Sequence, residues 1–156
     1  MSSTMRNIGN YITVQPGTIQ TITAGGTGDA TEVNGVTIDR NALTQGRGQS
    51  AVLAILVKAT MASAATTAIV TANFQDSAND SDWTDYGTAL GATTTHSAAG
   101  GALTASSAVA KLSVNLASAR RYIRAQVMCD LSASGTDTAL ISSVIIIAGQ
   151  SQLPSN

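Results

Sequence analysis

The residues best suited to metal or acid–base chemistry cluster between positions 76 and 85. This segment combines four aspartates with an asparagine, namely Asp76, Asn79, Asp80, Asp82 and Asp85. Oxygen ligands at such short spacing could hold Ca²⁺, but the glycine and glutamate of an EF-hand loop are missing. Asp and Asn side chains also cap their own backbone in turns. We therefore favour a solvated hairpin loop with Trp83 and Tyr86 packed over its base, and we predict no metal.

The single histidine and the single cysteine offer little catalytic potential. His96 lies in a stretch of small residues, without a recognisable nucleophile or metal motif, so we expect it at the surface. Cys129 belongs to a row of alternating apolar residues and is expected to pack in the core. The Gly-rich segments 25–28 and 46–49 match no phosphate-binding pattern and are expected to be turns.

The composition argues against an enzyme and against several other classes. Only 11% of the 156 residues are charged, and half of the chain is Ala, Thr, Ser or Gly. With one Glu, one His and one Cys, groups for acid–base chemistry are scarce, and we predict no cofactor. A net charge of −1 without a long basic stretch argues against nucleic-acid binding. The longest apolar run, 51–57, is too short to cross a membrane, and the N-terminus does not resemble a signal peptide.

Alternating apolar residues predict the strands that position these groups. In 67–75 the inward row is Ala68, Val70, Ala72 and Phe74, and in 122–131 it is Ile123, Ala125, Val127, Cys129 and Leu131. The segments 18–23, 36–39 and 111–116 show similar strand character. Seven or eight such strands, separated by turn residues, predict one antiparallel all-β sandwich or barrel.

Two segments, 52–57 and 144–147, are apolar on both faces. This pattern predicts central strands covered on both sides, although a buried helix also fits 52–60. One sandwich of this size covers only one face of each sheet. We therefore expect a second copy to supply the other cover, in a dimer or trimer. Alternatively, the terminal arms or the segment 89–110 fold back over that face.

The chain is predicted to be one domain with two arms. Residues 1–10 form an N-terminal arm, 11–149 the β-sandwich domain and 150–156 a C-terminal tail. The uncharged segment 89–110, rich in small residues, is a long loop, an edge ribbon or a surface ordered by a partner. The arms could add to the sheet edge of a partner.

Parts of the sequence resemble the capsid cement, or decoration, proteins of tailed bacteriophages. The resemblance lies in Phe74-Gln-Asp-Ser77 followed by Asp82-Trp83-Thr-Asp85, in Ala119 to Gln126 with its Arg-Tyr-Ile-Arg strand, and in the closing strand 138–149. It covers residues 50–150 and implies a β-sandwich or jelly-roll fold. It also implies a non-enzymatic virion protein, made in the host cytoplasm, that oligomerises on the outer capsid surface and cements the lattice of the major capsid protein.

The residues predicted to contact the capsid or another copy are few. They are Arg6, Tyr11, Arg120, Arg121, Arg124, Ile145 and Ile147. The three arginines of 120–124 form the only basic cluster. They could pair with carboxylates of a partner, or they could occupy a turn and an exposed strand face.

Three other functions compete with the cement protein. One is another virion component of similar fold, such as a head–tail connector, a tail protein or a fibre-base protein. Another is a carbohydrate- or receptor-binding β-sandwich, which needs exposed aromatic residues. The third is a glycoside hydrolase using two of the aspartates of 76–85.

Overall fold

The computed structural model describes residues 8–62, 66–132 and 136–149, and most of them belong to strands. A short 3-10 helix, Ile8–Tyr11, leads into the first strand. The strands are β1 Ile12–Thr23, β2 Val33–Asn34, β3 Ile38–Asp39, β4 Ser50–Met61, β5 Thr67–Ser77, β6 Thr84–Ser97, β7 Leu103–Asn115, β8 Tyr122–Leu131 and β9 Thr138–Ala148. The expected strand at 52–60 is therefore confirmed, and the helical alternative is wrong. No helix in these ranges is long and apolar enough to cross a membrane.

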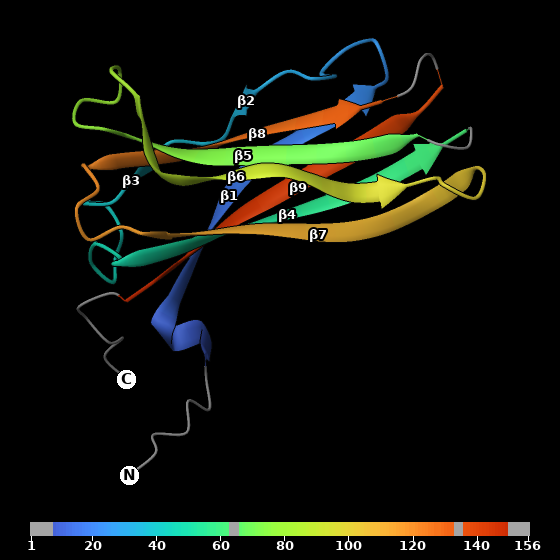
Figure 1. The fold of residues 1–156 in the computed structure, drawn as a ribbon. Coiled ribbons are helices and arrows are strands. Elements are labelled where there is room, and N and C mark those ends of the chain that lie inside the picture. The colour runs from blue at the N-terminus through green and yellow to red at the C-terminus, as the bar shows by residue number, and fades with distance from the viewer. Residues whose placement is uncertain (1–7, 63–65, 133–135, 150–156) are drawn as a thin grey trace.

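The strands form two antiparallel sheets that pack face to face as a β-sandwich (Figure 1). Sheet A has the order β1-β9-β4-β7, and sheet B has the order β2-β8-β5-β6. The short strands β2 and β3 pair with the same strand, β8, and together act as one interrupted strand. Counted in this way, eight strands follow the order of a jelly roll, with two four-stranded sheets. The predicted all-β, jelly-roll-like sandwich is confirmed.

Alternation along each strand sends one row of side chains into the core between the sheets. The predicted inward rows of β5 and β8 are confirmed, since their members are 0–5% exposed. Leu53, Ile55 and Val57 of β4 meet them from sheet A. The burial of these side chains is the main stabilising contribution to the fold.

The segment rich in small residues forms two edge strands. Most of 89–110 belongs to β6 and β7, which end one side of sheet B and of sheet A respectively. The edge-ribbon alternative is therefore the correct one. Ala98, just after β6, and Ala110 of β7 are buried in the core.

The two segments that are apolar on both faces lie in β4 and β9, and each has one row of side chains in the core and one row facing outward. In β9, Ile145 and Ile147 are fully buried in the core, whereas Val144 and Ile146 belong to the outward row and are only half-buried. The choice of Ile145 and Ile147 as contact residues was therefore wrong. Both rows of this segment are apolar, so the sequence alone gave no means of telling which row faces outward.

Candidate docking face

The outward side of sheet A, called the apolar face below, exposes several large apolar side chains. Its exposed large side chains come from all four strands of the sheet. They are Val14 (57% exposed), Ile19 (77%), Leu56 (49%), Val109 (69%) and Leu140 (44%). Clustered exposed apolar side chains commonly mark a site of interaction with another molecule. The apolar face therefore has the character of a surface that binds another molecule.

The strand register brings these outward side chains together. Leu56 of β4 lies opposite Val109 of β7 and opposite Ser142 of β9. Across β9, Ser142 lies opposite Ile19 of β1. Opposed residues on one face of an antiparallel pair are direct neighbours. An apolar strip, interrupted by Ser142 of β9, thus runs across the sheet from β1 to β7.

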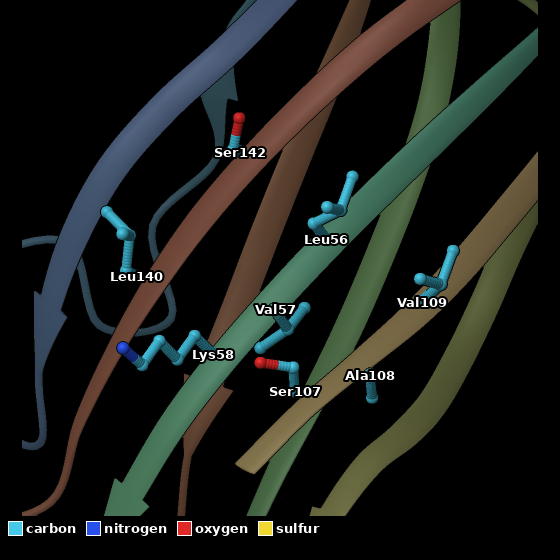
Figure 2. A pocket seen from close by; sticks show the side chains of 8 residues that line it. All are labelled: Leu56, Val57, Lys58, Ser107, Ala108, Val109, Leu140 and Ser142. Atoms are coloured by element: carbon cyan, nitrogen blue, oxygen red, sulfur yellow. The ribbon is translucent and has the colours of Figure 1, made fainter. Parts of the chain in front are cut away.

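A shallow depression of about 310 Å³ lies within this strip (Figure 2). It is lined by side chains of β4, β7 and β9, including Leu56, Val109 and Leu140. Ser107 and Ser142 also line it, and their small side chains leave the space that larger residues would fill. The depression is therefore large enough for one side chain from outside.

The charge of the apolar face has a single sign. The four strands of sheet A contain no Asp or Glu, and their only charged residues are Lys58 and Lys111. Lys58 lies opposite Leu140 and Ser107, and Lys111 lies opposite Ala54. Within the described ranges, the ion pairs are Arg120–Asp76 and Arg121–Asp39, and neither involves a lysine.

The outward side of sheet B differs because its polar side chains satisfy one another. The Asn73 amide donates to Asp85 Oδ1 at 2.8 Å and to Gln126 Oε1 at 3.1 Å. The Gln75 amide donates to the same Asp85 oxygen at 2.9 Å. The Gln126 amide in turn donates to Asn34 Oδ1 at 2.7 Å. Such a polar surface is well solvated. Covering it with a partner would therefore stabilise it less than covering the apolar face would.

The arginines of the basic cluster 120–124 interact with other residues of the same chain. Arg120 binds Asp76 through its guanidinium, with the closest N–O distance 2.6 Å, and through its backbone N–H at 2.8 Å. Burial raises the pKa of Asp76, but these hydrogen bonds outweigh it and hold the pKa below its ordinary value. Arg121 pairs with Asp39 at 2.7 Å, and this hydrogen bond lowers the pKa of Asp39.

Arg124 is also occupied within the chain. Its guanidinium donates to Gln75 Oε1 at 2.8 Å and stacks 4.3 Å from the centre of the Trp83 ring. The three arginines thus stabilise a turn and a strand face. Of the two roles considered from the sequence, this is the one within the chain rather than pairing with a partner. They are poor candidates for pairing with a partner's carboxylates.

The aspartate-rich segment forms a hydrogen-bonded loop between β5 and β6. Asn79 Oδ1 accepts from the backbone N–H groups of Ser81 and Asp82, and the Asn79 amide donates to Asp82 Oδ2 at 2.7 Å. Tyr86 packs against the core and donates from its hydroxyl to the Asn115 carbonyl at 2.9 Å. In the ranges that the structure describes, no three metal-ligating side chains converge. The loop geometry fits the hairpin interpretation.

His96 and Cys129 are both buried. The expectation of a surface His96 was wrong, because its ring is enclosed and its Nε2 lies 3.0 Å from the Ser106 carbonyl oxygen of β7. This contact joins the edge strands of the two sheets. Cys129 is in the core as predicted, and burial raises the pKa of its thiol to about 12. Such a thiol is a poor nucleophile at neutral pH.

Arg40 is a structural residue that sequence reasoning missed. Its side chain is buried, and its guanidinium donates to the carbonyls of Gly48 and Leu116, each at 2.8 Å, and to those of Ala119 and Arg120. Desolvation by burial lowers its pKa. The residue therefore ties together the loops that precede β4 and β8. A lone arginine in a loop carries no spacing signal by which it could have been found.

Two predicted contact residues remain. Tyr11 ends the 3-10 helix next to β1 and is 39% exposed. Because Ile12 of β1 lies opposite Ala148 of β9, Tyr11 lies at the end of sheet A where β9 finishes. Arg6 lies outside the described residues, as do the predicted arm residues 1–7 and the tail 150–156.

Comparison with known proteins yields little sequence similarity. No protein-family model and no curated protein matches the chain. Solved structures that resemble it include one described as the structure of infectious bursal disease virus, Gx strain. The match has 12% identity and a TM-score of 0.39, and it covers 92% of this chain. The chain spans about a third (32%) of the length of that viral chain.

Proposed function

We propose that the chain is a non-enzymatic structural protein of a virion that binds to the outer surface of a tailed-phage capsid and cements the lattice of its major capsid protein. The observation that carries the proposal is the apolar face, whose exposed side chains surround a depression lined by Leu56, Val109 and Leu140. The resemblance of residues 50–150 to cement proteins supports the same role.

The state of the reactive side chains supports a role in binding rather than catalysis. Asp76 is engaged by Arg120, and Asp85 accepts hydrogen bonds from Asn73 and Gln75. His96 is enclosed between the edge strands. A catalytic acid or base must reach a substrate in a cleft. These groups instead hold strands and loops together.

The proposed mechanism is stabilisation by mass action. A protein that binds only the assembled, expanded shell lowers the free energy of that shell relative to its ruptured state. Many identical weak contacts on one lattice strengthen the effect, above all if copies associate as a dimer or trimer and bind together. A stiff sandwich suits this role because little conformational entropy is lost when it binds.

The proposal can be tested on capsids prepared without this chain. Purified protein is added back, and the temperature at which the shells release their contents is followed with a DNA-binding dye. We expect the release temperature to rise with protein concentration and then to reach a plateau as the sites fill. An unrelated protein of similar size is the control. An unchanged release temperature at saturating protein would contradict the cementing role.

A further inference from the structure

We infer that the apolar face docks a protein surface that presents an aliphatic or aromatic side chain flanked by carboxylates. The inference deepens the proposed function and rests on it for the identity of the partner, which would be the subunit of the shell. The chemistry of the partner follows from the shape and the charge of the face itself.

The shape of the face is complementary to a protruding apolar side chain on the partner. The depression between Leu56, Val109 and Leu140 has a volume of about 310 Å³, enough for one large side chain. It lies over β4 and β9, the two middle strands of sheet A, and over the edge strand β7. Binding energy at interfaces concentrates where a large side chain fills a pocket of this kind.

The positive charge of the face is complementary to carboxylates beside that side chain on the partner. Along β4, Lys58 follows Leu56 by two residues, and along β7, Lys111 follows Val109 by two residues. Because β4 and β7 are antiparallel, the two lysines lie on opposite sides of the Leu56–Val109 pair. Neither has a carboxylate partner within the part of the chain that the structure describes. Complementary charges on the partner would fix its register and speed its association.

A second copy of the chain fits this face poorly. Two copies placed face to face would bring four lysines together, and the strands of sheet A contribute no acidic residue to balance them. Like charges directly opposite each other are destabilising. Contacts between copies on a lattice would then use other surfaces.

A membrane surface also fits poorly. Stable attachment to anionic lipid typically requires a cluster of about four to eight basic residues or a lipid anchor in addition to apolar contacts. The face has only Lys58 and Lys111. A depression sized for one side chain is likewise a feature of protein partners rather than of a bilayer.

The first experiment measures binding of fluorescently labelled protein to capsids prepared without the chain. Val109→Glu and Leu56→Glu place a negative charge on the face, at exposed positions. Thr94→Glu, at an exposed position of β6 in sheet B, adds the same charge to the other sheet and is the matched control. We expect binding to weaken by about tenfold or more in the first two variants and by less than about twofold in the control. Circular dichroism and thermal unfolding verify that all three fold.

The charge of the partner is tested in the same assay. The double variant Lys58→Gln and Lys111→Gln should bind more weakly than the wild type, and its affinity should depend less steeply on salt. If wild-type protein binds and all these variants bind equally well, the assignment of the docking face is overturned, while the cementing role stands.

A second measurement does not depend on the capsid. The labelled protein is titrated by NMR with the peptide acetyl-Glu-Phe-Glu-amide, and acetyl-Lys-Phe-Lys-amide is the control. We expect shift changes at Leu56, Ser107, Val109 and Leu140 with the acidic peptide and much smaller changes with the basic one. Equal changes, no changes or changes elsewhere would overturn the inference, even if the wild type fails to bind capsids and the proposed function is wrong.

Two further outcomes would identify another occupant and overturn the inference. In sedimentation velocity, a wild-type oligomer that Val109→Glu converts to a monomer would show that a second copy covers the face. If the wild type floats with vesicles containing 30% phosphatidylserine and Val109→Glu does not, the face binds a membrane surface. We expect neither result.

Discussion

Leu56 of β4 and Val109 of β7 lie directly opposite each other on the outward side of sheet A, and both side chains are exposed. Exposed large aliphatic side chains that cluster on one face commonly mark a site of interaction with another molecule. Here the layer on the inward side is sheet B, and the outward side has no cover from the described residues. This pair is the centre of the proposed docking face.

The inward row of β8 predicts a large effect of a charge in the core. Val127→Asp should destabilise the fold by more than about 3 kcal/mol, because the fully buried position offers the carboxylate no partner. Met128→Asp, one residue further along the strand in the outward row, is the control and should cost much less. Urea unfolding followed by circular dichroism measures both. A stable, cooperative Val127→Asp variant would show that the register is wrong.

Arg40 is predicted to stabilise the loops around it. Arg40→Met should lower the free energy of unfolding by about 3 kcal/mol, because four backbone carbonyls lose the guanidinium that they share. Arg47→Met removes an exposed arginine seven residues away and should change stability by less than about 0.5 kcal/mol. Equal stabilities of the two variants would argue against a structural role for Arg40.

The Asp76–Arg120 pair predicts a loss of stability in acid. The pKa of Asp76 is lower in the folded chain than its unfolded value of about 3.9, so the ionised carboxylate stabilises the fold above that pH. The stabilisation should disappear as the pH falls through the folded pKa. In Asp76→Asn, the free energy of unfolding should therefore depend less on pH between about pH 5 and pH 2.

The control for this pH dependence is Asp80→Asn. Asp80 has a backbone φ of 63°, a left-handed conformation that asparagine also adopts readily. Its urea-unfolding profile against pH should follow the wild type. If Asp76→Asn also follows the wild type, the pair does not contribute to stability as described.

Cys129 is predicted to be unreactive until the chain unfolds. Its thiol is fully buried, and burial raises its pKa to about 12, so the reactive thiolate is scarce at neutral pH. Ellman's reagent should label no thiol in the native protein and one thiol in guanidinium chloride. Val109→Cys supplies an exposed thiol as the positive control. Rapid labelling of the native wild type would mean that β8 opens readily or is placed wrongly.

The strand pattern could be predicted where polar and apolar residues alternate. In β5 and β8 one row is apolar and the other is mostly polar, so the direction of each side chain followed from the sequence. In β9 the residues 144–147 are all apolar, and only the pairing with β1 and β4 determines that Ile145 and Ile147 face inward. Long-range pairing of this kind leaves no local trace in the sequence.

The candidate face could be predicted only in part. The sequence predicted that 52–57 and 144–147 need a second cover, and the outward residues of these two segments, Val52, Ala54, Leu56, Val144 and Ile146, are apolar. It could not indicate that Val109, in a run of small residues, lies opposite Leu56, because 53 residues separate them. The burial of Arg40 likewise depends on contacts with a distant segment, and that of His96 depends on how the edge strands β6 and β7 meet.

The most direct test of the proposed function is the number of copies of this chain in purified virus particles. Quantitative mass spectrometry with isotope-labelled peptides gives the ratio of this chain to the major capsid protein. A cement protein is expected in hundreds of copies, in a simple ratio to the shell subunit. Three to a dozen copies would contradict cementing and place the chain at a connector, tail or fibre base, and its absence from the particle would contradict any virion role.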